Sequence, residues 1–557
     1  MSKLRVGLIL DQGAQSKIVR DFLENSANSP YFDVELLIVQ KRSDTNSVSG
    51  FGRIGKMIGQ RGIRKTLRNA FFKIIKTVEG HLIRRFSDYG GYFDKYDILD
   101  FGIDEFHVAP IVSKSGYIYR YSTEDLRAIK DSNLDLLVRG GSGILRGEIL
   151  NVCRLGVISF HHGDNDLFRG GPPAFWEVFL REPATGFIIQ RLKDELDGGD
   201  VLFKGKIKTS PIYSLNLVRL YSRSNIFLAN LIEHIARSGS APETYPKVPY
   251  CFPLYTTPDL VVQSRYVFRV LFYIVKKVID KVRNRGVRWN VGYQFVDNWR
   301  DVSLRRSNVI DNPRGAFLAD PFVLEHDGRK VCFVEEFSYR SKKGVISAYE
   351  LSGDNAHRLG VVLEEPFHLS YPFLLTVGDE VYMVPESHEA GEIRVYRCSS
   401  FPTQWEYSHT ILKDVSAADS SIFFRDDKWW LLTNLDSSGG NDHHSELHLF
   451  CADSLFATEW QSHPCNPVVF DSRKGRNGGL IIEGDEVFRV FQEYGWDNYG
   501  ESFGVCRVLE LSSKKYSEDE VFRVRPSFYK GINGTHSFSY SSGVVAFDFS
   551  RIGSLSD

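Results

Sequence analysis

The spacing of hydrophobic residues divides the chain into two parts. From Leu4 to about residue 240, the apolar runs LRVGLIL, FDVELLIV, LDLLVRGG and LGVISFH read as strands, and SKIVRDFLE reads as a helix. This alternation predicts an α/β domain of Rossmann-like architecture over residues 1–240, built on a parallel sheet. Ligands of such domains bind beyond the carboxyl ends of the strands, and the loop that begins at His161 lies at such an end.

The pattern changes at Trp289, where short β-rich runs replace helical periodicity. Five similar hairpins follow one another about fifty residues apart, a period typical of a β-propeller. Their first turn residues are Asp327, Gly378, Asp426, Gly484 and Ser542. The sequence therefore predicts a multidomain protein whose residues 289–557 form an all-β, five-bladed propeller.

The first strand of each propeller blade lines the central channel, so equivalent positions should form a ring at one mouth. Counting back from each turn gives Asp320, Tyr371, Asp419, Asn477 and Thr535. Counting forward gives Glu335, Glu386, Asn434 and Gln492, which the antiparallel second strand returns to the same mouth. Asp320, Glu335, Glu386 and Asp419, with Trp429, Trp430 and Tyr382 nearby, predict a sugar-binding funnel.

Two further stretches place apolar residues at helical spacing with Lys and Arg on the other face. One covers residues 59–86, within an insertion of about residues 53–88, and the other covers residues 265–288, within a linker over residues 241–288. Each predicts either a helix packed on its own domain with a solvated basic face, or a helix that lies on an anionic membrane surface or substrate.

Composition narrows the functional classes. The chain has 69 basic and 70 acidic residues, so it has no net positive charge that would attract nucleic acid. No nucleic-acid partner is therefore expected. The seven cysteines form no C-x-x-C pair, which fits reduced thiols and predicts no metal site. The apolar runs are too short for a signal peptide or a membrane span, so a cytoplasmic protein is expected, with peripheral membrane contact through the basic helices as an option.

One region carries a family resemblance. The segments GVISFHH, RGGPPAFWEV and ATGFIIQRLKDELDGGDVLFKGKI follow one another from Gly156 to Ile207. This order resembles the folate-dependent formyltransferase family, which includes glycinamide ribonucleotide, methionyl-tRNA and nucleotide-sugar formyltransferases. The resemblance extends more weakly to Leu4 through LDLLVRGGSGIL. It implies the formyltransferase fold and N10-formyltetrahydrofolate as formyl donor.

The resemblance places the family histidine at His161 and the family aspartate at Asp197. Formyl transfer passes through a tetrahedral oxyanion, so His161 would donate to that oxygen or move the proton, and Asp197 would fix its tautomer. The residues implied to hold the cofactor are Gly140, Gly141, Ser142, Gly143, Ile144, Leu145, Arg169 and Gly170.

One position departs from the family pattern. Ser159 stands where the family has asparagine, and loss of one oxyanion donor costs about 3–4 kcal/mol. His162 follows directly after the family histidine, and our hypothesis is that it replaces the missing donor.

The propeller also carries a resemblance. LADPFVLEHDG is similar to the first blade of five-bladed propellers of the arabinanase and β-fructosidase type, and to the propeller of the glucosamine inositolphosphorylceramide transferase family. In the hydrolases the first-blade aspartate is a base or nucleophile, which implies that role for Asp320 and an acid role for Asp419 or Glu386. Glycan binding, glycoside chemistry and a structural role all remain open.

Together these features predict a transferase that moves a formyl group to an amine on an activated or lipid-linked sugar in surface-polysaccharide biosynthesis. The alternative is a glycan-binding or glycan-active propeller protein, associated with glycosidase or glycosyltransferase chemistry, whose N-terminal domain does not transfer formyl groups. In both cases the partner is a sugar or glycan, either nucleotide-linked or lipid-linked.

Overall fold

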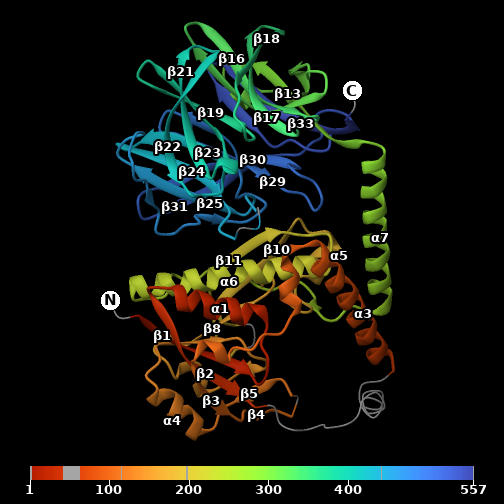
Figure 1. Cartoon of the computed structure of the whole chain (residues 1–557), viewed down its shortest axis with the longest axis vertical. Helices are drawn as coiled ribbons and strands as arrows, with labels where there is room; N and C mark the ends of the chain where they lie inside the picture. Colours follow the sequence, from red (N-terminus) through yellow and green to blue (C-terminus); the bar gives the residue numbers. More distant parts are fainter. Residues whose placement is uncertain are drawn as a thin grey trace. The chain divides into compact units, whose positions relative to one another are not determined.

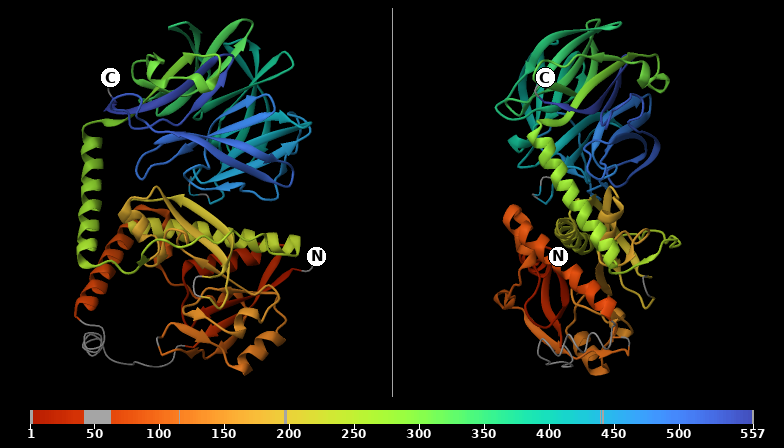
Figure 2. Two further views of the ribbon diagram at one scale, coloured as in Figure 1. Left: turned by 180° about the vertical axis from the view of Figure 1, so that it is seen from behind. Right: turned by 90° about the vertical axis from the view of Figure 1, so that its right-hand side faces the viewer.

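The computed structural model describes residues 3–41, 63–114, 116–195, 198–438, 440 and 442–555. Contacts divide the chain into two compact units, Met1–Leu271 and Phe272–Asp557. The division falls inside the long helix α7 (Leu260–Val282), which covers much of the helix predicted over residues 265–288 (Figure 2). The predicted domain limits at residues 240 and 289 stay predictions.

A seven-stranded sheet organises the first unit, in the order β11-β10-β8-β6-β1-β2-β3 (Figure 1). Strands β8, β6, β1, β2 and β3 run parallel to one another, whereas β10 and β11 add an antiparallel pair at one edge. The bounds are β1 (Leu4–Asp11), β2 (Phe32–Gln40), β3 (Asp104–Val108), β6 (Leu136–Arg139), β8 (Val157–His161), β10 (Ala184–Arg191) and β11 (Asp200–Lys208). The expected parallel arrangement holds for five of the seven strands.

Helices cover both faces of this sheet. Helices α1 (Lys17–Asn28) and α6 (Tyr213–Ser238) pack on each other, and α6 also contacts β2, β10 and β11. On the other face, Ile129 of α4 (Thr123–Asp131) packs in one apolar cluster with Ile9 and Leu137. The central strands are therefore buried on both sides, as their unbroken apolar runs require.

The first unit also contains elements outside the seven-stranded sheet and the helices described so far. Helix α3 (Ile63–Phe86) packs on α6 and on the 3-10 helix η1 (Asp88–Phe93), and the predicted residues 59–62 lie outside the described part of the chain. The remaining helix and the strands of two small sheets are α5 (Phe175–Leu180), β4 (Ile111–Val112), β5 (Ile118–Arg120), β7 (Ile144–Leu145), β9 (Arg169–Gly170) and β12 (Leu254–Tyr255).

The second unit consists of five antiparallel sheets. The first four hairpin-rich sheets contain β15 (Ala316–His326) to β18 (Asn355–Leu363), β19 (Ser370–Val377) to β22 (Gln404–Lys413), β23 (Ala417–Arg425) to β27 (Val469–Phe470), and β28 (Asn477–Glu483) to β31 (Tyr516–Val524). The intervening strands are β16 (Arg329–Ser338), β17 (Lys343–Ser352), β20 (Glu380–Glu386), β21 (Glu392–Ser400), β24 (Lys428–Leu435), β25 (Glu446–Ala452), β26 (Gln461–Ser462), β29 (Glu486–Glu493) and β30 (Ser502–Leu511).

The fifth sheet joins the two ends of this unit. Its order is β14-β13-β33-β32, so β13 (Arg285–Phe295) from the start of the unit pairs along its length with β33 (Val544–Ser554) from the end. Strands β14 (Asn308–Ile310) and β32 (Phe538–Ser541) complete it. Strands β15, β19, β23, β28 and β32 contact one another in sequence, and β32 contacts β15. The first strands of the hairpins thus surround one centre in a propeller-like arrangement.

Helix length and polarity bear on membrane topology. In the part of the chain that the structure describes, no helix is both long enough and apolar enough to cross a membrane.

Candidate functional site

A repeated backbone irregularity brings polar residues to the centre of the second unit. The first hairpin of each of three sheets breaks its register at the same place. Each break holds two residues, and the first of each pair is Asp320, Tyr371 or Asp419. Their φ values are 49°, 44° and 47°, in the left-handed region that is uncommon for residues other than glycine. Such bulges re-aim side chains, and here they direct the predicted ring residues away from the strand's ordinary alternation.

The second strand of each hairpin supplies the partners. Glu335 pairs with Ala319, Glu386 with Ser370 and Asn434 with Ala418, each directly before the bulge. Gln492 occupies the corresponding place, because its amide donates to the carbonyl of Arg476. The antiparallel pairing therefore returns these residues to the end of the hairpin where the bulge lies. We call Asp320, Glu335, Glu386 and Asp419 the carboxylate ring; all four are buried.

Arg476 links two members of the carboxylate ring. Its Nε contacts Asp419 Oδ2 at 2.5 Å, and its second terminal nitrogen lies 3.2 Å from Asp419 Oδ1 and 3.3 Å from Glu386 Oε2. Gln492 also donates to Asp419 Oδ2 at 2.9 Å. Burial of the guanidinium is tolerated because its charge is paired and hydrogen-bonded.

A histidine between two carboxylates forms the other side of the site. His536 Nδ1 lies 2.6 Å from Asp548 Oδ2, and its Nε2 lies 3.8 Å from Asp320 Oδ1. Although burial alone would lower its pKa, the charges of Asp548 and Asp320 raise it above the usual value. Ser537 donates to Asp320 Oδ1 at 2.6 Å, so two neighbouring residues, His536 and Ser537, approach this carboxylate.

These three residues are also spaced like metal ligands. Asp320, His536 and Asp548 each offer a ligand atom within 4.8 Å of the others. The short His536 to Asp548 hydrogen bond already accounts for that spacing, and the prediction of no metal stays a prediction.

Two members of the carboxylate ring have opposite acidities. Burial, together with the negative charges of Asp320 and Glu386, raises the pKa of Glu335 well above its usual range. Burial would also raise the pKa of Glu386, but the hydrogen bond from His388 and the charge of Arg476 outweigh it and hold the pKa far below the usual range. His388 Nδ1 lies 2.8 Å from Glu386 Oε1. Environments that separate two pKa values in this way are typical of acid and base pairs.

The assignment of acid and base thus differs from the sequence-based expectation. Glu386 was expected to serve as an acid, but its ionised state suits a base. The pKa of Glu335 is raised, which is the direction that suits an acid. Asp419, the other expected acid, accepts hydrogen bonds from Arg476 and Gln492, yet burial and the charge of Glu386 raise its pKa well above the usual range, so the expected acid role of Asp419 stays a prediction.

The aromatic residues at the site also differ from those expected. Trp430 pairs with Phe423 and Tyr382 with Leu375, and Trp429 packs on Phe424. All three lie toward the hairpin turn, about 13–17 Å along the strand from the ring positions. The aromatic residues that contact the site come from other segments: the Trp289 ring stacks on His536 at 4.0 Å, and Tyr499 packs edge-on against His536 at 5.2 Å. Tyr499 is 37% exposed, so its ring is open to a ligand.

In the first unit, the two predicted catalytic positions on β8 lie on one face of the strand. Ser159 is buried and accepts a hydrogen bond from Arg139 at 3.4 Å. His161 Nε2 lies 3.4 Å from the carbonyl of Phe168. Asp197 lies outside the described residues, so its predicted partnership with His161 stays a prediction.

His162 does not take the role that we hypothesised. Strand alternation places it on the opposite side from Ser159, where Nε2 bonds to Ser224 Oγ at 3.1 Å. Its ring stacks on Phe160 and meets Tyr221 edge-on at 4.6 Å. Burial lowers its pKa to about 3, so the imidazole is a neutral packing group rather than a second oxyanion donor.

The predicted cofactor loop is bonded mostly to its own unit. The amide and hydroxyl of Ser142 donate to Asp11, the amide of Gly140 donates to Ile9, and the amide of Ile144 donates to Tyr117. Gly141 lies against Gln40 and Asp11, Gly143 lies against the ring of Tyr119, and Leu145 is buried. Several backbone groups that would hold a pterin ring are therefore already satisfied, and the folate expectation stays a prediction.

Arg169 and Gly170 form a short strand instead of an open loop. β9 pairs with β12, the Arg169 guanidinium stacks on Tyr250 at 4.4 Å, and Gly170 lies directly against the Tyr255 carbonyl. Both residues therefore have structural partners within the first unit.

Sequence reasoning missed Arg476, His536 and Asp548. Two of them are immediate neighbours of counted positions, because Arg476 precedes Asn477 and His536 follows Thr535. Asp548 lies on the last strand, outside the counted pattern.

The comparisons with known proteins concern both units. Residues 304–541 match the family described as "Glucosamine inositolphosphorylceramide transferase 1, N-terminal". The protein named glucosamine inositolphosphorylceramide transferase 1 from Arabidopsis thaliana is 34% identical over 210 residues, which are 37% of this chain and 27% of that relative. This chain therefore spans only about a quarter of the length of that protein.

Two weaker similarities were found. Methionyl-tRNA formyltransferase from Staphylococcus aureus (strain JH1) is 22% identical over 246 residues, 42% of this chain and 75% of that protein. Among solved structures, the α-L-arabinofuranosidase from Podospora anserina in complex with cellotriose aligns with 43% of this chain and 93% of its own, at 10% identity and a TM-score of 0.33.

These comparisons correct the predicted activity. Formyl transfer was expected as the main reaction, but the more similar relatives are named for transfer involving glucosamine and inositolphosphorylceramide, and similarity to formyltransferases is distant. The prediction of formyl transfer is therefore wrong, and the alternative of a glycan-directed propeller protein associated with glycosyl transfer is better supported.

Proposed function

We propose that the second unit binds a sugar at the carboxylate ring and takes part in glycosyl transfer. The observation that carries this proposal is the buried carboxylate ring, in which Glu335 and Glu386 hold equivalent positions on neighbouring sheets around the same centre while their surroundings raise the pKa of the first and lower that of the second. A transfer at a sugar carbon needs an acid to protonate the leaving oxygen and a carboxylate to activate the attacking group or stabilise positive charge. In this proposal Glu335 is the acid and Glu386 is the base. The relatives' names support a sugar substrate.

The charge of the site favours an amino sugar. Five buried carboxyl groups, the carboxylate ring and Asp548, surround one arginine and one histidine. Burial raises the pKa values of Asp320, Glu335 and Asp419, so a cationic ligand would favour their ionisation, and in this proposal the ammonium group of an amino sugar supplies that cation. The exposed ring of Tyr499 offers an apolar face for the sugar. We also propose that the second unit is a propeller of five blades, as the sequence predicts.

Calorimetric titration of the full chain with glucosamine, N-acetylglucosamine and glucose tests sugar binding. We expect glucosamine to bind most tightly, because acetylation removes the ammonium charge. Glu335→Gln should weaken glucosamine binding. Glu325→Gln makes the same chemical change on an exposed residue at the turn end of β15 and should leave binding unchanged. Equal binding of all three sugars would contradict the amino-sugar assignment, and no binding of any sugar would contradict the proposed function.

A further inference from the structure

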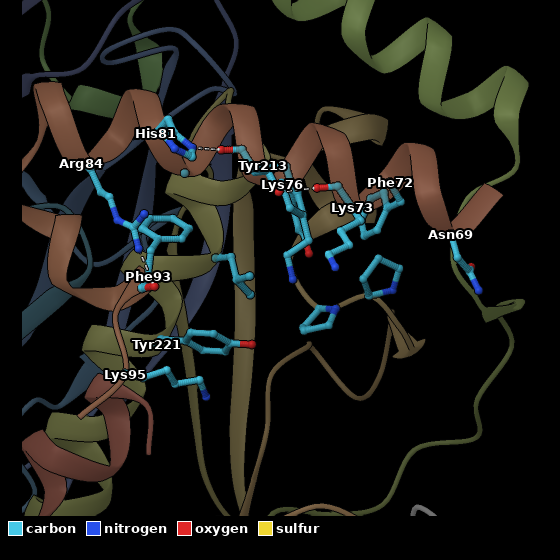
Figure 3. Close-up of a pocket in the computed structure, with 15 residues that line it drawn as sticks. Asn69, Phe72, Lys73, Lys76, His81, Arg84, Phe93, Lys95, Tyr213 and Tyr221 are labelled. Carbon is cyan, nitrogen blue, oxygen red and sulfur yellow. Dashed lines mark hydrogen bonds between the residues drawn. The ribbon is translucent and has the colours of Figure 1, made fainter. Parts of the chain in front are cut away.

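A basic groove lies between α3 and α6 in the first unit. Its volume is about 750 Å³. One face of α3 forms one wall, through Asn69, Phe72, Lys73, Lys76, Thr77, Gly80, His81 and Arg84, which recur at three- and four-residue spacing. One face of α6 forms the facing wall through Tyr213, Leu217 and Tyr221, and Pro172 and Pro173 lie between them. In Figure 3, Lys73 extends from α3 toward the side of the groove where Tyr221 lies, and Lys95 lies beside Tyr221.

The groove is strongly positive. Lys73, Lys76, Arg84 and Lys95 line it, and its fifteen lining residues include no aspartate or glutamate. Arg84 pairs with Asp94 at 2.8 Å, but no ion pair within the described residues involves the three lysines. Three uncompensated ammonium groups facing one cavity are a favourable environment for a multiply charged anion.

The groove also borders apolar surface. Its α6 wall is aromatic and aliphatic, and the proline pair adds to it. On α3, a stripe of exposed apolar residues runs beside the basic face: Ile63, Leu67, Ile74, Val78 and Leu82. At 3.6 residues per turn, these residues lie within roughly 100° of His81 on the side away from the lysines, so the apolar stripe borders the basic face of the helix at His81. A ligand that fits both surfaces combines a compact anion with a hydrocarbon chain.

We propose that the groove between α3 and α6 binds a diphosphate or phosphate group joined to an apolar chain, with Lys73, Lys76 and Lys95 around the anion. His81 donates from Nδ1 to the carbonyl of Thr77 at 2.7 Å, which leaves Nε2 as the nitrogen that could contact the ligand. The chain would follow the apolar stripe of α3. This proposal rests only on residues of the first unit, so it stands or falls separately from sugar binding at the carboxylate ring.

Three soluble probes distinguish the ligand classes: inorganic pyrophosphate, uridine diphosphate and geranyl diphosphate. Calorimetric titration of the full chain should show geranyl diphosphate binding about tenfold or more tightly than the other two, because it alone offers a chain to the apolar stripe. Binding should weaken as salt is raised from low to physiological concentration. Preference for uridine diphosphate would overturn the assignment in favour of a nucleotide site, and binding of none of the three would overturn it outright.

Matched variants locate the site. Lys73→Gln with Lys76→Gln removes two groove charges, and we expect about tenfold weaker binding of geranyl diphosphate. Lys65→Gln with Arg85→Gln removes the same charge from exposed positions of α3 that do not line the groove, and binding should be unchanged. All four side chains are exposed, so folding is expected to be preserved, which a thermal melt checks. Equal loss in both double variants would show a general attraction to the basic helix and contradict a defined site.

Discussion

Glu335 and Glu386 occupy equivalent positions on neighbouring sheets, yet their surroundings shift their pKa values in opposite directions. Glu335 lies among other carboxylates, with His368 Nε2 3.5 Å from its Oε1, whereas Glu386 receives a hydrogen bond from His388 and faces Arg476. The repeat supplies two similar carboxyl groups, and their different neighbours raise the pKa of one and lower that of the other. This asymmetry underlies the proposed chemistry and leads to measurable effects on stability.

Replacing Glu335 by glutamine should change how stability depends on pH. The raised pKa means that folded Glu335 keeps a proton that the unfolded chain releases above about pH 4.3. The free energy of unfolding of the unmodified protein therefore loses this contribution as pH rises, and the variant does not. Urea unfolding should show that the free energy of unfolding of the variant, relative to that of the unmodified protein, is higher at pH 8 than at pH 5. The exposed Glu325→Gln serves as control, and a constant difference between the two pH values would contradict the raised pKa.

Loss of Arg476 should strongly destabilise the second unit. Arg476→Met leaves Asp419 and Glu386 buried without their cation, a change that costs about 3–5 kcal/mol in comparable buried pairs. The matched control is Arg397→Met, which removes an exposed ion pair to Glu380 and should cost less than about 1 kcal/mol. Denaturant midpoints measure both. Similar costs for the two variants would show that Arg476 is not the central counter-ion.

His162 should remain neutral in the folded protein well below the usual histidine range. Burial lowers its pKa to about 3, whereas the unfolded chain takes up the proton near pH 6.5. The contribution of His162 to stability is therefore present above pH 6.5 and declines as pH falls toward 3. NMR of the imidazole nitrogens, assigned with His162→Gln, should show no titration between pH 7 and pH 4. A resonance missing from the variant that titrates above pH 5 would contradict this placement.

Gly170 should not tolerate a side chain. Its φ is 101°, and an added Cβ would lie 2.1 Å from the carbonyl oxygen of Tyr255. Gly147 also has a positive φ, 84°, but has open space around it. Gly147→Ala should therefore cost only the conformational strain, about 1–2 kcal/mol, whereas Gly170→Ala should cost more because β9 and β12 must separate. Thermal melts of both variants give the comparison, and equal costs would mean that the close approach is easily relieved.

Periodicity explains why much of the architecture could be predicted from the sequence. The apolar runs of β1, β2, β6 and β8 identify buried parallel strands, and the repeated hairpins identify the β-rich unit. A fixed offset from each hairpin turn also identified Asp320, Glu335, Glu386 and Asp419. This works because the register of a hairpin determines which residues of its two strands lie at the end away from the turn. These features depend on spacing, which one sequence displays directly.

Features that depend on contacts between distant segments were not predictable in this way. Arg476 joins Asp419 and Glu386 across separate sheets, and His536 reaches Asp548 and Asp320 from the chain's last hairpin. Trp429 and Trp430 were expected at the site because they are close to the ring positions in sequence. They lie near the hairpin turn instead, because a few residues of extended strand separate them from the ring. The role hypothesised for His162 failed because adjacent residues of a strand face opposite sides.

At the bulges of Asp320, Tyr371 and Asp419, the backbone sets the direction of the side chain whatever the type of residue. All three residues share nearly the same backbone conformation, but one is aromatic and two are acids. A substitution at such a position changes the chemistry offered to the centre without changing the path of the chain around it. The residues that face the centre can therefore be replaced one sheet at a time, and each replacement changes what the site binds while the backbone of the unit stays the same.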